Sequence, residues 1–186
     1  MHWCGQRMDE SKRRQMMNPE AILTDIGLKP GCTFVDVGCG DGFFALPAAH
    51  IVGSEGRVYG VDINSERINE LRKKAASEGL TNVELKAGKA EETIFCQECA
   101  DIVFFGNVLH DFQDPVKVLN NARKMIKGTG KLIDLDWKKI ATTYGPPLSI
   151  RFDEATATRL IESCGFKMEA IKDSGPHHYL IITTPK

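Results

Sequence analysis

A strand that runs directly into a glycine-rich turn, and then into a helix, constrains the fold of this chain more than any other feature. Residues 35–42 read VDVGCGDG, so glycine occupies every second position once the apolar stretch ends. Glycine lacks a Cβ atom, accepts positive φ and lets a ligand lie against the backbone. The following helix adds unpaired N–H groups and the positive end of its dipole. This arrangement predicts an α/β domain with a cradle for a nucleotide-type ligand.

The glycine spacing and a neighbouring acid discriminate between ligands. A dinucleotide fingerprint, G-x-G-x-x-G, would need glycine at position 43, where this chain has Phe43. Asp36 lies two residues before the first glycine, and its carboxylate would repel a pyrophosphate but suit an ammonium group. A nicotinamide oxidoreductase is therefore disfavoured, and we keep it as the weakest alternative.

A second short strand ends in an acid at the spacing expected of a nucleotide site. Residues 57–62 read RVYGVD, and Asp62 follows Gly42 by 20 residues. At this position an α/β site places the carboxylate that accepts both ribose hydroxyls. The alternative role is the N-cap of the next helix, but Asn64 or Ser65 can fill it. We therefore favour ribose binding for Asp62.

Together these motifs resemble the class I S-adenosylmethionine-dependent methyltransferases, whose first motif is D/E-x-G-x-G-x-G. The resemblance covers roughly residues 20–186 and is greatest to the small quinone-biosynthesis type. It implies S-adenosyl-L-methionine as the cofactor. The implied cofactor-binding residues are Asp36, Gly38, Cys39, Gly40, Gly42, Asp62, Ile63, Lys89, Ala90 and Asn107.

The chain departs from the family's pattern at the tip of the third strand. There the family usually carries an acid that meets the adenine amino group, whereas residues 88–91 here read GKAE. Lysine cannot accept that hydrogen bond. Three alternatives stay open: the backbone of Lys89 and Ala90 holds the adenine, Glu91 substitutes for the acid, or the affinity is reduced.

The segment after the fourth strand resembles the family's fourth motif. Residues 101–107, followed by VLHD at 108–111, resemble the segment that passes under the methionine end in quinone-biosynthesis methyltransferases. Asn107 should contact the ligand largely through its main chain. This position also agrees with the rule that ligands lie outside the carboxyl ends of the strands in an open α/β sheet.

Methyl transfer from a sulfonium mainly requires alignment, so a base is needed only if the acceptor is protonated. His110 is the leading candidate, because its unperturbed pKa is near neutrality and it lies just past the central strand. A histidine that only binds backbone is an equal alternative. Asp111 is a weaker catalytic candidate, as are Asp136 and Tyr144.

Strands and helices alternate along the chain. Strands are expected at residues 34–37, 57–62, 82–87, 100–106, 131–137, 167–172 and 179–184. Helices are expected at about 41–52, 65–79, 115–128 and 153–165, with Asp41, Asp114 and Asp153 as N-caps. The last two strands are too close for a parallel crossover, so they form an antiparallel hairpin. The resemblance implies a Rossmann-like, mostly parallel seven-stranded sheet in the order 3-2-1-4-5-7-6, with the last strand antiparallel and helices on both faces.

Two segments lie outside the shared core and must form any acceptor pocket. One is the N-terminal stretch, expected as a helical cap at residues 1–28 before the cofactor-binding domain at 29–186. The other is residues 138–152, which lack periodicity and read as a loop or lid. The pocket would be partly apolar through Trp3, Met8, Met16 and Met17.

Charge and hydropathy favour a small-molecule acceptor over a nucleic acid or a membrane. The chain holds 24 Lys and Arg residues against 25 Asp and Glu residues, so it has no general affinity for anionic partners. No apolar run approaches the length of a membrane span and the N-terminal residues lack a signal-peptide core, so we expect a cytoplasmic protein. The oligomeric state stays open, and a module that binds the cofactor without catalysis is the second alternative.

Six cysteines are expected to be reduced thiols rather than disulfides or metal ligands. Cys96 and Cys99 have the C-x-x-C spacing of a zinc half-site, but no second such pair accompanies them. Only Cys4, His2 or a distant thiol could complete a tetrahedral set. We therefore expect no metal.

Overall fold

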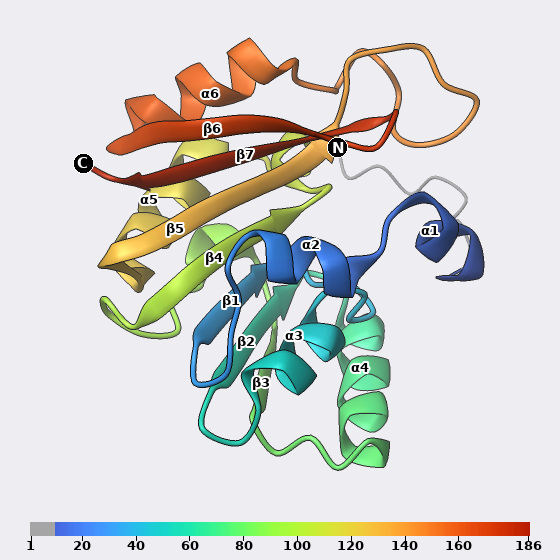
Figure 1. The fold of residues 1–186 in the computed structure, drawn as a ribbon, viewed down its shortest axis with the longest axis vertical. Coiled ribbons are helices and arrows are strands. Elements are labelled where there is room, and N and C mark those ends of the chain that lie inside the picture. The colour runs from blue at the N-terminus through green and yellow to red at the C-terminus, as the bar shows by residue number, and fades with distance from the viewer. Residues whose placement is uncertain (1–9) are drawn as a thin grey trace.

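A seven-stranded sheet flanked by helices forms the centre of the protein in a computed structural model that describes residues 10–186 (Figure 1). The strands run in the order β3-β2-β1-β4-β5-β7-β6, and β7 is antiparallel to both of its neighbours, as predicted. The remaining neighbours pair in parallel. The strands are β1 (Thr33–Val37), β2 (Arg57–Asp62), β3 (Val83–Ala87), β4 (Ala100–Gly106), β5 (Ile126–Trp137), β6 (Phe166–Ser174) and β7 (His178–Pro185).

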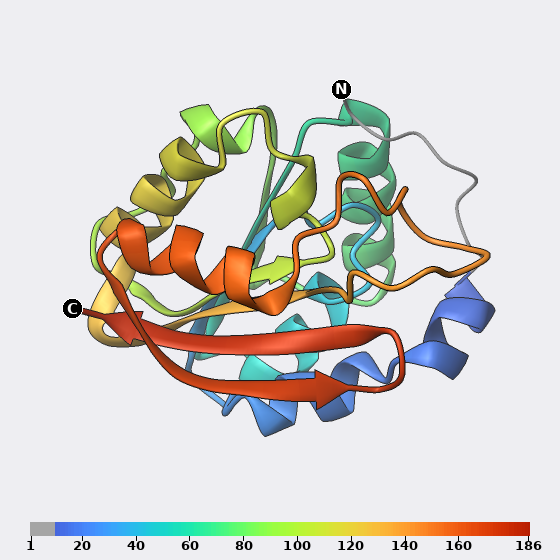
Figure 2. The same cartoon turned by 90° about the horizontal axis from the view of Figure 1, so that it is seen from above.

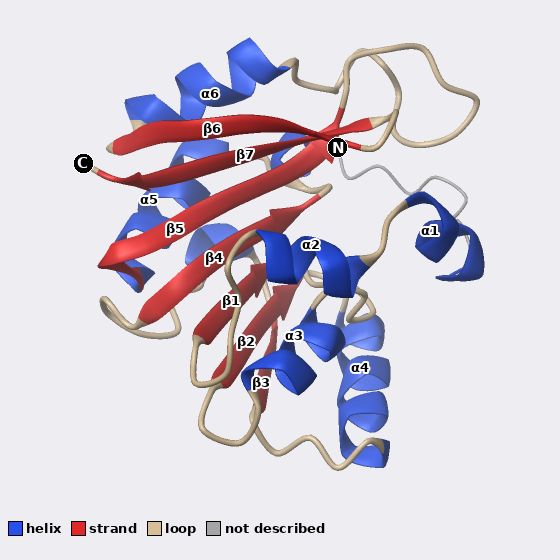
Figure 3. Ribbon diagram, in the orientation of Figure 1, coloured by secondary structure: helices blue, strands red, loops and turns tan. Residues whose placement is uncertain are grey.

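Helices cover both faces of the sheet, as predicted (Figure 3). Residues of α2, α3 and α4 pack into one hydrophobic cluster and those of α5 and α6 into the other, so α2 and α6 lie on opposite sides of the sheet (Figure 2). The α-helices are α1 (Glu10–Met16), α2 (Pro19–Asp25), α3 (Ala45–Val52), α4 (Ser65–Ser77), α5 (Pro115–Met125) and α6 (Glu154–Ser163). Two short 3-10 helices are η1 (Ala90–Glu92) and η2 (Leu109–Asp111).

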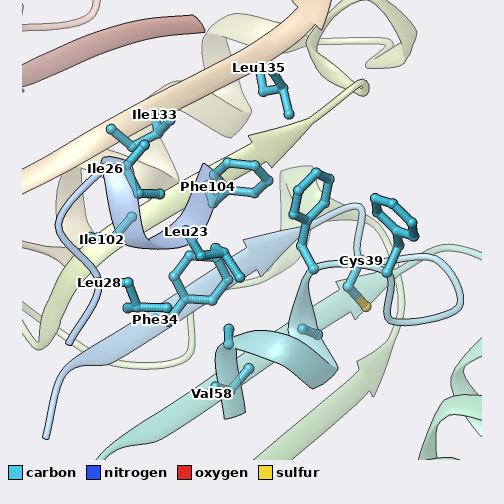
Figure 4. Packing of buried hydrophobic residues seen from close by; sticks show 14 of the residues in the cluster. Leu23, Ile26, Leu28, Phe34, Cys39, Val58, Ile102, Phe104, Ile133 and Leu135 are labelled. Atoms are coloured by element: carbon cyan, nitrogen blue, oxygen red, sulfur yellow. The ribbon is translucent and has the colours of Figure 1, made fainter. Parts of the chain in front are cut away.

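Aromatic side chains fix the central strands against α2 and α3. Phe34 of β1 and Phe104 of β4 are fully buried with ring centroids 5.7 Å apart, and Phe44 lies 4.7 Å from Phe104. Leu23 of α2 and Ile26, which follows the helix, pack into the same layer (Figure 4). Burial of each large apolar side chain contributes about 1.5–3 kcal/mol. This layer holds the turn that follows β1 in place.

Three helices begin at a polar cap that the sequence predicts. The side chains that accept hydrogen bonds from the first backbone N–H groups of α4, α5 and α6 are those of Asn64, Asp114 and Asp153. Such caps satisfy donors that have no partner inside the helix.

The prediction that Asp41 caps the next helix is wrong, because α3 begins at Ala45. Gly42 has φ of 90°, and a Cβ atom there would lie 2.2 Å from Leu71 Cδ1 of α4. Only glycine allows this left-handed turn so close to α4. Asp41 instead pairs with Arg13 of α1 at 3.1 Å.

The border between α5 and β5 also differs from the prediction. The helix ends at Met125 and the strand starts at Ile126, whereas the helix was expected to reach residue 128 and the strand to start at 131. Ile126 is fully buried and pairs with Ala100 of β4. A Cβ atom on Gly130 would lie 2.8 Å from the Ala100 carbonyl oxygen, so this glycine lets the strands approach closely.

The prediction of reduced thiols is wrong for Cys96 and Cys99, which form a disulfide. The intervening Glu98 has φ of 47° and donates its N–H to the Lys124 carbonyl oxygen, so the turn brings both cysteines together. Among the described residues, no cluster of three or more His, Cys, Asp or Glu side chains is arranged to hold a metal ion. Cys4 and His2 lie outside those residues.

Within residues 10–186, no helix is both long and apolar enough to cross a bilayer.

Candidate functional site

The carboxyl ends of β1, β2 and β4 open into a cavity of about 720 Å³. Residues of α1, the end of β5 and the loop at 138–152 complete its walls. Most of the predicted site residues line it, and they are Asp36, Gly38, Cys39, Gly40, Asp62, Ile63, Asn107, His110 and Asp111. The sheet thus brings together residues that are far apart in the sequence.

A smaller cavity of about 120 Å³ adjoins the first and is lined by two further predicted contacts, Lys89 and Ala90. Asp62 and Ile63 line both cavities, so the two spaces are neighbours at the end of β2. The Lys89 side chain is half exposed, with Nζ 4.0 Å from a carboxylate oxygen of Glu92.

The glycine turn is tied to the end of β2 by backbone hydrogen bonds. Gly38 and Cys39 donate their N–H groups to the Val61 carbonyl oxygen. A Cβ atom on Gly38 would lie 2.5 Å from Val108 Cγ2, whereas one on Gly40 would meet only Asp62 Oδ2, at 4.0 Å. The space beside Gly40 is therefore open to a ligand. Gly42 packs against α4 and lines neither of these two cavities.

Asp62 is held by the turns around it and does not cap α4. Its carboxylate accepts the N–H of Gly40 at 2.9 Å and that of Asn64 at 2.8 Å. Asn64 is the cap, because its side chain accepts from Glu66 and Arg67. A carboxylate has about four acceptor positions, so Asp62 keeps capacity for hydroxyl donors in the cavity.

Asp36 is a buried carboxyl group at the floor of the large cavity. Its Oδ2 atom has no hydrogen-bond partner among the residues that the structure describes. Burial and the Asp62 charge raise the pKa of Asp36 to about 8, although Arg13 and the Ala45 N–H act in the opposite direction. A cationic group beside Asp36 would favour its ionised form.

Asn107 adopts a left-handed backbone conformation, with φ of 58°. Its N–H donates to the Leu135 carbonyl oxygen at 2.7 Å, which fixes the turn after β4. Its Oδ1 atom is buried and unpaired within the described part of the chain. Non-glycine residues rarely adopt this conformation, and asparagine is among those that tolerate it best.

His110 and Asp136 form a buried pair at one wall of the cavity. His110 Nδ1 lies 2.8 and 2.9 Å from the two carboxylate oxygens of Asp136, and both side chains are 2% exposed. Asp136 Oδ1 also accepts the N–H of Trp137 at 2.7 Å. Burial lowers the pKa of His110, but the Asp136 carboxylate outweighs it and the pKa lies above its ordinary value.

Aromatic side chains form the outer wall of the cavity. The Trp137 ring lies 5.9 Å from Tyr144 and 4.2 Å from His178 between centroids. Burial lowers the pKa of His178 to about 4, so this histidine is neutral at neutral pH. Met16 and Met17 also line the cavity, as expected, whereas Trp3 and Met8 lie outside the described residues.

Arg151 holds the loop at 138–152 in shape. Its guanidinium group is buried and lies 5.0 Å over the Trp137 ring. Its N–H groups donate to the carbonyl oxygens of Lys138, Ile140, Tyr144 and Pro146 and to the Thr142 hydroxyl. One side chain therefore satisfies most of the turn backbone around Tyr144.

The model of a protein family described as "Methyltransferase domain" matches residues 28–163. The chain belongs to this methyltransferase family. The match begins just before β1 and extends through α6, so it contains strands β1 to β5 and ends before β6 and β7.

Curated relatives of this methyltransferase domain include two demethylmenaquinone methyltransferases. The protein of Geobacillus kaustophilus is 30% identical over 126 residues, which are 68% of this chain and 54% of the relative. That of Bacillus cytotoxicus is 33% identical over 109 residues, 59% of this chain and 46% of the relative. The chain spans about half the length of these relatives.

Solved structures agree with the assignment to this family. A SAM-dependent methyltransferase from Aquifex aeolicus superimposes with a TM-score of 0.88 at 27% identity, covering 97% of this chain and 100% of that one. A geranyl diphosphate C-methyltransferase from Streptomyces coelicolor has the same fold, with a TM-score of 0.75 at 15% identity, covering 90% of this chain and 75% of that one.

Several groups at the site of the methyltransferase domain were not singled out from the sequence. Arg13 of α1 and His178 of β7 line the cavity, and Arg151 shapes its loop. Asp136 was named only as a weak base, and its contact with His110 spans 26 positions. One local signal existed, because acids at 134 and 136 lie within an apolar strand and buried carboxylates usually need a partner.

Proposed function

We propose that this protein transfers a methyl group from S-adenosylmethionine to a small-molecule acceptor bound beneath the loop at 138–152. The observation that carries the proposal is the pair of neighbouring cavities at the ends of β1, β2 and β4, with the carboxyl groups of Asp36 and Asp62 beside them. Membership of the methyltransferase family supports the same function.

The polar groups of the large cavity fit the methionine and ribose parts of this cofactor. The Oδ2 atom of Asp36, which has no hydrogen-bond partner among the described residues, suits the ammonium group, because a buried carboxylate is stable only beside positive charge or donors. The held carboxylate of Asp62 suits the ribose diol. The open space at Gly40 lets the ligand approach the backbone, with Cys39 and Asn107 on either side.

The smaller cavity fits the adenine ring between apolar walls. Ile63, Ala90, Val108 and Phe112 line it, and an acidic side chain, Glu91, borders it as well. Lys89 turns toward Glu92 at the surface. Of the three alternatives for adenine, we favour Glu91 as the acceptor of the exocyclic amine, together with the backbone of Lys89 and Ala90.

The cofactor supplies a methyl group on a positively charged sulfur, and the protein supplies alignment. Binding the acceptor in line with the methyl carbon converts a bimolecular displacement into an effectively unimolecular one. Asp36 and Asp62 orient one reactant, and the aromatic wall at Trp137 and Tyr144 orients the other. His110, with Asp111 beside it, is available where the acceptor must lose a proton.

We further propose that residues 1–28 act as a cap over the domain at 29–186, since Arg13 and Met16 of α1 line the cavity. The size of the cavity supports an acceptor that is a small molecule rather than a nucleic acid or a membrane surface. We propose that the protein acts in the cytoplasm, which cell fractionation would test.

The second candidate is a module that binds the cofactor without catalysis. Lys89, which replaces the usual adenine acceptor, favours it. Turnover distinguishes the two functions, because only a methyltransferase releases S-adenosylhomocysteine in the presence of an acceptor.

Calorimetry with S-adenosylhomocysteine tests the cofactor assignment. In Asp62→Ala, two ribose hydroxyls lose a charged acceptor, so we expect the affinity to fall by roughly 2–4 kcal/mol, or tens- to hundreds-fold in Kd. Glu55→Ala is the matched control, because this exposed carboxylate precedes β2 at the opposite edge of the sheet.

An unchanged affinity in folded Asp62→Ala would contradict the assignment. Binding of NAD in place of S-adenosylhomocysteine would instead favour an oxidoreductase. Once binding is established, a screen of quinols, phenols, thiols, amines and metalloids for release of S-adenosylhomocysteine separates the enzyme from the binding module.

A further inference from the structure

The contact between His110 and Asp136 fixes which ring nitrogen of the histidine faces the cavity. Nδ1 lies 2.8 and 2.9 Å from the two oxygens of one carboxylate, which cannot donate a hydrogen bond when ionised. Nδ1 must therefore carry the proton. The ring borders the cavity, and Nε2 is the nitrogen left to face it with a free lone pair.

The position of the pair argues against a purely structural role. His110 lies in η2, past the end of β4, and Asp136 lies near the end of β5, so they join two neighbouring strand ends at the cavity. Burying a charged pair costs desolvation and contributes little net stability compared with apolar packing. A second carboxylate, that of Asp111, also lines this wall and has a buried, unpaired Oδ1 among residues 10–186.

We propose that Asp136 is a positioning residue that holds His110 as the general base for an acceptor with an aromatic hydroxyl group. The assignment rests on the proposed methyl transfer and narrows its acceptor to one chemical class. His110 contacts the acceptor proton and is the catalytic residue of the pair, whereas Asp136 acts only through His110.

The walls of the cavity support a flat acceptor. Trp137 and Tyr144 meet at 5.9 Å between ring centroids, and Phe44 borders the cavity from the side of the glycine turn. Aromatic rings pack on one another in offset or edge-to-face arrangements worth about 0.5–1.5 kcal/mol beyond their burial. The neutral His178 adds a hydrogen-bonding group without adding charge.

The step balances with the groups that are present. The hydroxyl oxygen of the acceptor gives its proton to His110 Nε2 and forms a bond to the methyl carbon. The bond from that carbon to the sulfonium sulfur breaks, and its electron pair stays on sulfur. The products are a methyl ether, a neutral thioether and an imidazolium, which then releases its proton to solvent.

The charged groups around His110 favour proton uptake. Asp111 of η2 and Asp136 of β5 raise its pKa, whereas burial and Arg151 lower it. Asp134, two residues before Asp136, is fully buried, and burial together with the Asp136 charge raises its pKa well above the ordinary value. Both causes favour the protonated form of Asp134.

Binding of 4-nitrophenol to the protein loaded with S-adenosylhomocysteine tests the pair without turnover. The ionised phenol is yellow, so the absorbance shows what fraction of the phenol has lost its proton. We expect the ratio of anion to neutral phenol to rise at least about tenfold on binding to the wild type, because the pair stabilises the phenolate. His110→Gln and Asp136→Asn should abolish this rise while their Kd for S-adenosylhomocysteine stays within about twofold of the wild type.

A surface histidine supplies the matched control. His50 Nε2 lies 2.7 Å from Glu78 Oε2, and both side chains are exposed. His50→Gln therefore removes a similar pair outside the large cavity and should leave the phenol absorbance unchanged. The 15N shifts of His110 in the wild type should show a protonated Nδ1 in the neutral ring, a measurement that requires no variant to fold.

Turnover of phenols found in the screen completes the test. We expect Asp136→Asn to lower kcat by about 10²- to 10⁴-fold with little change in the cofactor Kd, and Asp136→Glu to recover part of the rate. The wild-type kcat should rise with pH through the titration of His110, and Asp136→Asn should shift that rise.

Three results would overturn the inference. The first is that 4-nitrophenol does not bind. The second is that the neutral ring of His110 carries its proton on Nε2. The third is that a thiol or an amine is methylated at a rate independent of His110. Each leaves the proposed function standing if S-adenosylhomocysteine still binds. Failure of S-adenosylhomocysteine to bind the wild type would instead remove the proposed function itself.

Discussion

Asp36 is the residue whose protonation is most closely tied to its surroundings. Its pKa is raised to about 8 by burial first and by the Asp62 charge second, so the group is neutral at pH 7. A ligand ammonium group beside it would favour the ionised form, and binding would then release one proton. The affinity for S-adenosylmethionine should therefore depend on pH in a predictable direction.

We expect the affinity for S-adenosylmethionine to rise by about tenfold per pH unit between pH 6 and 7.5 and to level off near pH 8. Isothermal titration in two buffers of different ionisation enthalpy should report release of close to one proton at pH 7. A flat affinity across this range would contradict a contact between Asp36 and the ammonium group.

Asp36→Asn is the control, since the amide keeps the shape and removes the titration. A rise in pH increases cofactor affinity through Asp36 but decreases folding stability through the same residue. The reason is that the pKa of Asp36 in the folded protein lies above its unfolded value near 4. The folded state then holds the proton more tightly. Free protein should lose stability as the pH rises from about 4 to about 8, and Asp36→Asn should lose less.

Residue identities predicted the cavity lining at the ends of β1 and β2 better than the lining at the end of β5. Asp36, Asp62 and the glycines lie in short local motifs, where spacing alone carries the information. The contact between His110 and Asp136 joins η2 to β5 and depends on two neighbouring strands ending at the same level. No local sequence pattern predicts at which height in the sheet these two strands end.

The loop at 138–152 is an element without regular structure whose shape depends on Arg151. In Arg151→Lys, a single ammonium group cannot reach the carbonyl oxygens that the guanidinium satisfies at both ends of the loop. We expect a melting temperature several degrees lower and faster tryptic cleavage after Lys138 and Lys139, measured by thermal unfolding and limited proteolysis.

The affinity for S-adenosylhomocysteine should stay within about twofold in Arg151→Lys, because Arg151 lines neither cavity and its hydrogen bonds go to the loop. Arg159→Lys is the matched control, since Arg159 is exposed on α6 and bonds only Thr156 within the described contacts. Equal proteolysis of both variants would mean that Arg151 does not hold the loop.

The periodicity of apolar residues predicted the helices and strands that have one clearly apolar face. It did not predict where these elements begin and end. The caps at Asn64, Asp114 and Asp153 were visible as polar residues before an apolar stripe. The start of α3 depends on the close approach of Gly42 to Leu71, a contact between the glycine turn and α4. The start of β5 depends likewise on the pairing of Ile126 with Ala100.

Considered as one molecule, the protein should be stabilised as a unit by its cofactor, because the cavities join turns from β1, β2, β3 and β4. At a ligand concentration of 100 times Kd, mass action adds about 2.7 kcal/mol. For a domain of this size we expect S-adenosylhomocysteine to raise the melting temperature by about 5–11 °C.

NAD at the same concentration is the control ligand in this thermal measurement and should give no shift, since Phe43 stands where a dinucleotide site needs glycine. A larger shift with NAD than with S-adenosylhomocysteine would contradict the proposed function.

The sheet order itself was predictable from the resemblance to the methyltransferase family, because alternating strands and a closing hairpin allow few arrangements.

The insertion of β7 between β5 and β6 makes the two halves of the site mature at different times during synthesis. The cradle for the cofactor uses β1 to β4, all of which leave the ribosome early. Tyr179 pairs with Asp136 and His178 with Trp137, so the acceptor wall is supported by the last strand of the sheet. We therefore expect a nascent chain to form the proposed cofactor cradle before the proposed acceptor wall, and to become able to transfer a methyl group only after β7 has inserted between β5 and β6.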